Sequence, residues 1–465
     1  MIEIYIVIDN RIALFETEKL SRAIMKLSIP TVLSSLVMII YSLADTFFVG
    51  MLNDSIQNAA VTLAAPVLLA FNAVNNLFGV GASSMISRAL GRKEYDTAYR
   101  SSSFGFYCSL FSGVVFSLLC LVFNDSLLLM VGADSVTYEA TKAYLKWTVL
   151  FGASPAILNV VMSYMVRAEG AALHASIGTM SGCILNIVLD PIFVLPQFLG
   201  MGAEGAALAT FISNSFAVVY FLVLLFVRRK TTYVSINPRY FSFKKAIVVG
   251  VCAVGIPASI QNLLNVTGMT ILNNFTSSYG SDAVASMGIA QRLNNVPISI
   301  AMGFSQGVMP LVGYCYASGN IKRMKSAIVF TGRIVAIALV IVSIFYFFMA
   351  PAFISAFMDN PTIIDYGSTF LRGFCLGIPF LCIDFLAVGV FQAVGKGLNS
   401  LLFALTRKLF LEIPAIFILN RLFKLNGLPY SQLVTEIIMA IIAVVSLIHF
   451  FKSLRMSQAK MDKPN

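Results

Sequence analysis

Two carboxylic acids stand in stretches of sequence that are otherwise almost entirely apolar. Asp45 occurs in YSLADTFFVG and Asp190 in LNIVLDPIF, and each follows a polar residue by four positions, Tyr41 and Asn186 respectively. That spacing places each pair on one face of a helix. A carboxyl in apolar surroundings resists ionisation, and a second carboxyl nearby opposes it further. An acid that takes up and releases a proton in this way is what proton-coupled transport requires.

Two further apolar stretches carry polar pairs with the same spacing, Asn159 with Ser163 and Thr210 with Asn214. Polar and ionisable groups inside membrane helices usually face the interior of the helix bundle, so we expect the four stripes to share one site. The alternative is that these side chains only hold the helices together. The predicted cation-coupling site consists of Asp45, Asp190, Tyr41, Asn186, Thr210 and Ser163.

The coupling ion is expected to be a proton, or sodium bound at Asp45 and Asp190, and no cofactor, catalytic residue or other metal is predicted. A substrate cavity is expected where polar residues of several helices converge. Its predicted residues are Asn159, Asn214, Gln261, Asn265 and Asp384. Glu412 is interpreted as the partner of Lys408, four residues away, and Glu436 as structural.

The composition places all these residues in a membrane protein. Of the 465 residues, 58% are hydrophobic and 11% are charged, whereas a soluble domain carries about 25% charged residues. A bilayer span needs about 20 apolar residues, and twelve such stretches separated by short polar segments predict an all-α integral membrane fold. We place the spans at 28–50, 59–84, 101–124, 143–166, 171–195, 202–227, 246–273, 284–310, 327–352, 367–392, 398–423 and 430–452.

The distribution of basic residues predicts the orientation. The net charge is +11, but Lys and Arg form short clusters between apolar stretches, so nucleic acid is not an expected partner. Basic residues concentrate on the cytoplasmic side of membrane proteins. We therefore predict a multi-pass protein of the inner (cytoplasmic) membrane with both termini cytoplasmic. The loops predicted to lie outside contain no Lys or Arg; they are 51–58, 125–141, 274–283 and 353–366.

Landmarks of the first half of the chain return in the second half. Pro30 in SIPTVL corresponds to Pro257 in GIPASI, and Gly170 in RAEGAA corresponds to Gly395 in QAVGKG. Six spans in each half give both halves the same orientation, which is a parallel repeat with the substrate cavity between its halves. The predicted parts are a cytoplasmic N-terminal segment 1–27, an N-lobe 28–227, a cytoplasmic linker 228–245, a C-lobe 246–452 and a cytoplasmic tail 453–465.

The chain resembles the multidrug and toxic compound extrusion (MATE) family, and its DinF-like branch in particular. The resemblance extends over nearly the whole chain, and several segments carry it together. They are YSLADTFFVG, GVGASSMISRALGRKEYDTA, VRAEGAA, LNIVLDPIF, MGAEGAALAT, GIAQRL, PLVGYCYASGN and FQAVGKG.

This resemblance implies two six-helix lobes related by a pseudo-two-fold axis, and antiport of cationic and amphipathic drugs against protons or sodium by alternating access. It implies the coupling site in the N-lobe, at Tyr41, Asp45, Asn186, Asp190 and Thr210. Ser163 stands where the branch often has Asn. The expected partners are small drug-like molecules and the lipid bilayer, and the expected state is a monomer.

Two other functions compete with drug export. A lipid-linked precursor flippase of related architecture would show basic residues in its cavity. The only candidates away from the cytoplasmic clusters are Arg292, Arg372, Arg407 and Lys408. A membrane-embedded enzyme would show a motif such as HExxH or GxSxG, and because the sequence has neither, no enzymatic activity is predicted.

Overall fold

The computed structural model describes the backbone of residues 12–52 and 54–461, and side chains as far as residue 456. All regular elements within these residues are helices. Residues 1–11 of the predicted N-terminal segment and residues 462–465 of the predicted tail lie outside the described residues.

The first six membrane segments make up one lobe. Four are single helices, and the other two are interrupted by a π-helical stretch. In chain order they are α2 (Leu20–Gly50); α3 (Ser55–Val74) with η1 (Asn75–Val80) and α4 (Gly81–Gly91); α5 (Tyr95–Val122), followed by the short α6 (Asn124–Met130); α7 (Tyr138–Leu145) with η2 (Lys146–Leu150) and α8 (Ala153–Ala168); α9 (Ala172–Val194); and α10 (Gly202–Val227).

The second lobe repeats this arrangement after a connection that contains the short 3-10 helix η3 (Pro238–Tyr240). Its segments are α11 (Lys245–Ser277); α12 (Ser281–Ala317); α13 (Ile321–Ser355); α14 (Pro361–Ala393); α15 (Gly397–Leu405) with the π-helix η4 (Thr406–Glu412) and α16 (Ile413–Phe423), then η5 (Lys424–Gly427); and α17 (Tyr430–Met461).

Ten helices in the described part of the chain are long and apolar enough to cross a membrane, and the pair Tyr138–Leu150 and Ala153–Ala168, bent by 43°, adds an eleventh span. The twelfth segment, residues 397–423, runs without a break through α15, η4 and α16. It carries Arg407, Lys408 and Glu412 near its middle, which lowers its mean hydropathy and makes it atypical of a lipid-exposed helix.

Local sequence sets several helix ends. Asn360 accepts hydrogen bonds from the backbone N–H groups of Thr362 and Ile363, and Pro361 occupies the first position of α14, as is typical of helix starts. The first membrane helix begins at Leu20 rather than at the predicted residue 28, because Ala23, Ile24 and Leu27 are buried against the rest of the protein. The predicted landmark glycines share a backbone conformation, with φ of +88° at Gly170 and +83° at Gly395.

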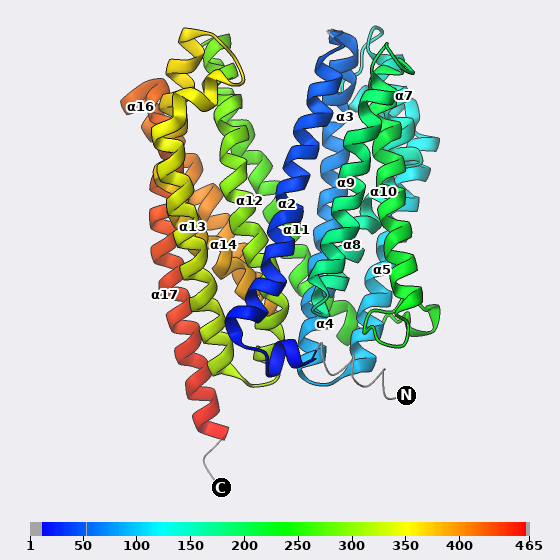
Figure 1. Cartoon of the computed structure of the whole chain (residues 1–465), viewed down its shortest axis with the longest axis vertical. Coiled ribbons are helices and arrows are strands. Elements are labelled where there is room, and N and C mark those ends of the chain that lie inside the picture. The colour runs from blue at the N-terminus through cyan, green and yellow to red at the C-terminus, as the bar shows by residue number, and fades with distance from the viewer. Residues whose placement is uncertain (1–11, 53, 462–465) are drawn as a thin grey trace.

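The two lobes stand side by side, with the start of α2 and the end of α17 at the same end of the molecule (Figure 1). Helix α2 lies between the lobes and packs on α9 of its own lobe and on α12 of the other. Helix α11 packs on η1 and α4 of the first lobe. Gly81 and Gly255 permit this close approach, since a Cβ atom at either would collide with a backbone carbonyl oxygen, that of Val251 or Leu77.

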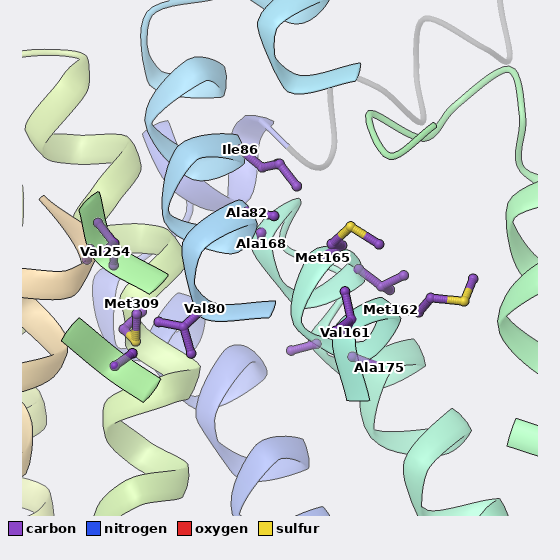
Figure 2. Close-up of a cluster of buried hydrophobic side chains, with 14 of the residues drawn as sticks. Val80, Ala82, Ile86, Val161, Met162, Met165, Ala168, Ala175, Val254 and Met309 are labelled. Atoms are coloured by element: carbon purple, nitrogen blue, oxygen red, sulfur yellow. The ribbon is translucent and has the colours of Figure 1, made fainter. Parts of the chain in front are cut away.

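A continuous apolar core extends across this junction. Figure 2 shows Ala82 and Ile86 of α4 beside residues of α8, including Met165, with Val254 of α11 and Met309 of α12 on the opposite side. Helix α4 therefore packs between α8 of its own lobe and α11 and α12 of the second lobe, at the end of the molecule where α2 begins and α17 ends.

The connection between the lobes is fixed to the first lobe. Thr232 Oγ1 donates to Glu169 Oε2 at 2.8 Å, and the backbone N–H of Tyr233 donates to the same oxygen at 2.7 Å. Tyr107 Oη on α5 donates to the carbonyl of Ile236 at 2.8 Å.

Candidate functional site

The packing of α2 against α9 brings the two predicted acids together. Asp190 is completely buried and Asp45 is partly buried, and their carboxyl groups lie near enough for the two charges to interact. Neither acid takes part in an ion pair among the described residues. Two uncompensated carboxylates at one apolar site repel each other, so the pair favours a state in which it holds a cation.

Asn186 links Asp190 to the neighbouring helix α10. The hydrogen-bonding groups around its amide are all paired when Nδ2 faces Asp190. In this orientation Nδ2 donates to Asp190 Oδ2 at 2.8 Å, and Oδ1 accepts from Thr210 N at 3.1 Å and from Thr210 Oγ1 at 3.3 Å. The assignment of amide O and N rests on this network. Asn186 thus holds the carboxylate through a hydrogen bond that favours its ionised form.

Two tyrosines surround the acids. The hydroxyl of Tyr41 lies beside Thr210 and within electrostatic range of both carboxyls. Tyr144 on α7, which was not predicted, lies within the same range of Asp45, Asp190 and Tyr41, and it is 6% exposed. The sequence did not indicate that Tyr144 belongs to the site, because Lys142 and Lys146 on either side are typical of a helix end at the membrane surface.

The remaining predicted residues of the first lobe make other contacts. Ser163 Oγ donates to the carbonyl of Val160 in its own helix at 2.8 Å. Asn159 Nδ2 donates to Asn214 Oδ1 at 3.1 Å, which joins α8 to α10. The structure therefore assembles Tyr41, Asp45, Asn186, Asp190 and Thr210, and the other three residues form hydrogen bonds elsewhere in the same lobe.

A cavity lies between the lobes. Of the residues predicted for a substrate cavity, Gln261 and Asn265 of α11 line it, whereas Asn159 and Asn214 are not among the lining residues. The other lining residues include the amides of Asn76, Asn262, Gln306 and Gln392 and the apolar side chains of Met302, Met309 and Phe385. Gln392 Nε2 donates to Gln261 Oε1 at 3.2 Å across the second lobe. An apolar wall with a few polar groups suits organic ligands, and the flexible Met side chains suit ligands of varied shape.

Asp384 is not among the residues that line this cavity. It is 2% exposed, and its Oδ2 atom lies 3.5 Å from Arg407 Nη1. Arg407 also binds Glu436, with Nη2 at 2.6 Å and Nε at 2.9 Å from Oε1. The predicted pair of Lys408 and Glu412 is present, with Nζ 2.6 Å from Oε2.

The family model MatE matches the chain twice, over residues 30–192 and 257–418, which together cover most of both lobes. This chain belongs to the MatE family. The resemblance to multidrug and toxic compound extrusion proteins is thus confirmed, and so is the two-lobed fold of twelve helices. The first match includes Asp45, Asn186 and Asp190 of the predicted coupling site, and the second includes Arg407 and Glu412.

Similar proteins agree with membership of the MatE family. The chain is 33% identical over 438 residues to the Multidrug export protein MepA of Staphylococcus haemolyticus, covering 94% of this chain and 95% of that protein. It is also 33% identical to the protein of the same name from Staphylococcus aureus strain MRSA252, with the same coverage. A solved outward-facing conformation of a multidrug resistance MATE family transporter of the MOP superfamily superposes with a TM-score of 0.90, at 27% identity, over 95% of this chain and 98% of that chain.

Proposed function

We propose that this MatE protein is a secondary antiporter that exports cationic and amphipathic organic compounds in exchange for protons. The observation that carries the proposal is the juxtaposition of Asp45 and Asp190, two acids without a basic partner, in one lobe of a membrane transporter. The two MepA relatives are named as multidrug export proteins, which supports drug-like compounds as the cargo. Neither an enzymatic reaction nor a resident cofactor is part of the proposal.

The two acids and their neighbours account for proton exchange. While the site is closed to water, simultaneous ionisation of both carboxyls is unfavourable, so the pair keeps at least one proton. When the site opens to water, hydration and the hydrogen bond from Asn186 stabilise the ionised pair, and the proton leaves. Sodium is the alternative occupant of the same pair of carboxylates, and it would use the same oxygen atoms.

The orientation belongs to the same proposal. The proposed location is the inner (cytoplasmic) membrane. Both termini, the connection 228–245 and the C-terminal end of α4 are proposed to lie on the cytoplasmic side, because basic residues cluster in these segments. The close contacts of α4 and η1 with α11 then lie on the cytoplasmic side. Similarity to a transporter solved in an outward-facing conformation supports the same state for this structure. For the lobes we propose the helix bounds 20–227 and 245–461 in place of the predicted 28–227 and 246–452, and a monomeric state completes the proposal.

A flippase for lipid-linked precursors is not favoured. Arg407 and Lys408, two of the basic residues considered for phosphate binding, are both bound to carboxylates in the second lobe. Their charge is therefore largely neutralised within the protein.

Uptake of ethidium into everted membrane vesicles tests the proposed function. An imposed proton gradient, acidic inside, is expected to drive uptake by vesicles that contain the wild-type protein. Asp45→Asn and Asp190→Asn vesicles are expected to lose this uptake at equal protein content. Full gradient-driven uptake by both variants would show that the carboxyls are structural. If only a sodium gradient drives uptake, the proposed site is kept and the coupling ion is sodium instead of a proton.

A further inference from the structure

The second lobe contains a buried network of five charged side chains that the coupling mechanism does not use. Asp384 lies on α14, Arg407, Lys408 and Glu412 on η4, and Glu436 on α17. Their side chains are between 1% and 15% exposed. Charged groups inside membrane helices are costly and are usually functional. Three of its residues also belong to a π-helical stretch, which is a local distortion that is frequent at functional sites.

The charges of the network do not balance. Three carboxyl groups face two basic groups, Arg407 and Lys408. Two carboxylate oxygens, Asp384 Oδ1 and Glu436 Oε2, are buried and have no hydrogen-bond partner in the part of the chain that the structure describes. An uncompensated carboxylate in a membrane interior is strongly unfavourable, so with all three carboxyls ionised the network lacks one positive charge, which a bound cation would supply.

Part of the network lines a second cavity. Arg407, Lys408 and Glu412 line it, together with Ser431 and the amide side chains of Asn265, Gln291, Asn294, Asn295 and Gln432. Asn294 is 5% exposed, and its Oδ1 atom has no hydrogen-bond partner. Asn265, Met302 and Phe385 line both this cavity and the one between the lobes. A compound in the central cavity therefore has a polar compartment of the second lobe directly beside it.

Within this compartment Glu412 is the carboxylate that a ligand meets. Among the described residues its carboxylate forms an ion pair only with Lys408, at 2.6 and 2.7 Å, whereas Arg407 lies between two acids. Gly268 of α11 leaves the space that the pair occupies, because a Cβ atom there would lie 3.1 Å from both Glu412 Oε1 and Lys408 Nζ. Phe374, Phe385, Met269 and Met302 supply the apolar wall.

We propose that Glu412 binds the cationic group of the exported compound and that this group displaces the ammonium group of Lys408. The compound is a monovalent organic cation with an apolar aromatic body. The displaced ammonium of Lys408 remains within electrostatic range of Asp384, whose Oδ1 atom has no hydrogen-bond partner among the described residues. The ligand's charge then completes the network, and its aromatic body contacts the Phe and Met side chains.

This inference rests on the proposed function and specifies where its substrate is recognised. Substrate and proton would occupy different lobes, Glu412 in the second and Asp45 with Asp190 in the first. Exchange between them would then pass through the packing of the lobes rather than through competition for one carboxylate.

Ethidium binding to the purified full-length protein, followed by fluorescence, tests the assignment. Glu412→Gln removes the acceptor but keeps the side-chain shape, and its affinity is expected to fall at least about tenfold. Lys408→Met removes the competing ammonium, and its affinity is expected to rise by about tenfold, so the two variants change affinity in opposite directions. Glu139→Gln, an exposed acid of the first lobe, is the matched control and is expected to bind as the wild type does.

Two results would overturn the assignment. Wild-type affinity in both Glu412→Gln and Lys408→Met, or a change in the same direction in both, excludes an exchange at Glu412. If the wild type nevertheless shows gradient-driven ethidium uptake in vesicles, the proposed function stands and only the binding site is wrong. If the wild type neither binds nor transports ethidium, the proposed function fails together with this inference.

Discussion

Asn186 and Asp190 are one helical turn apart on α9, and the amide Nδ2 of the first donates to the carboxylate Oδ2 of the second at 2.8 Å. Thr210 on α10 donates from both its N–H and its hydroxyl to Asn186 Oδ1, which fixes the direction in which the amide points. The acid is therefore oriented by a neighbouring helix as well as by its own. Any movement of α10 relative to α9 changes the stability of the ionised carboxylate.

Replacing Asn186 is the most direct test of this relationship. Asn186→Leu keeps the approximate volume but removes the hydrogen bond to Asp190, and a hydrogen bond to a charged group contributes about 1.5–3 kcal/mol. We expect gradient-driven export to fall by about tenfold or more at unchanged expression. Asn75→Leu, which replaces another buried amide of the same lobe, is the control and should export normally. Equal activity in both variants would show that Asn186 does not assist proton exchange.

Tyr144 is expected to influence the coupling site through its hydroxyl alone. Tyr144→Phe keeps the buried ring and removes the polar group within range of Asp45 and Asp190. We predict a shifted pH profile of export with little change in thermal stability. Tyr346→Phe is the matched control, since Tyr346 is also buried and donates to the carbonyl of Leu293 in the other lobe. Identical pH profiles for the wild type and Tyr144→Phe would show that the Tyr144 hydroxyl does not influence the site.

Close approach of α11 to η1 at Gly255 is expected to keep the cytoplasmic side closed. In Gly255→Ala the added methyl group would collide with the carbonyl oxygen of Leu77, so we expect the lobes to separate there. Spin labels on α4 and α11 should then report longer distances than in the wild type. Gly288→Ala is the control, because nothing lies within 4 Å of a Cβ atom at that helical position. Unchanged distances in Gly255→Ala would contradict a closed cytoplasmic contact at this glycine.

Orientation can be checked by labelling intact cells with an impermeant thiol reagent. We expect Val136→Cys, at a position that is 61% exposed in the loop between α6 and α7, to react, and Arg239→Cys in the connection between the lobes to remain unlabelled. The native cysteines of the described residues are buried or half-buried, which keeps the background low. Labelling of residue 239 instead of residue 136 would show that the protein has the opposite orientation in the membrane.

The grouping of polar side chains around the two acids was predictable from sequence because local periodicity determines which side chains share a helix face. Tyr41 with Asp45, and Asn186 with Asp190, are four residues apart, and their faces do meet where α2 packs on α9. The pair of Lys408 and Glu412 was predictable for the same reason. Apolar length likewise predicted the helices, although charge near the middle of residues 397–423 obscures the membrane-spanning character of that segment.

Contacts between distant helices were not predictable in this way. Asp384, Arg407 and Glu436 come from three separate segments, and no spacing in the sequence relates them. Asp384 was therefore expected in the substrate cavity, whereas the structure places it against Arg407. Tyr144 was missed because its charged neighbours resemble a helix end, although the π-helical stretch η2 that follows continues the helix.

Proton movement in liposomes tests the central claim most directly, because it measures the exchanged ion itself. Purified protein is reconstituted in liposomes with an acidic lumen that contains a trapped pH indicator, and ethidium is added outside. The account predicts that ethidium accelerates alkalinisation of the lumen with the wild type, and that Asp45→Asn and Asp190→Asn each abolish this acceleration. Ethidium-dependent alkalinisation at the wild-type rate in both variants would contradict a proton exchange at these two acids.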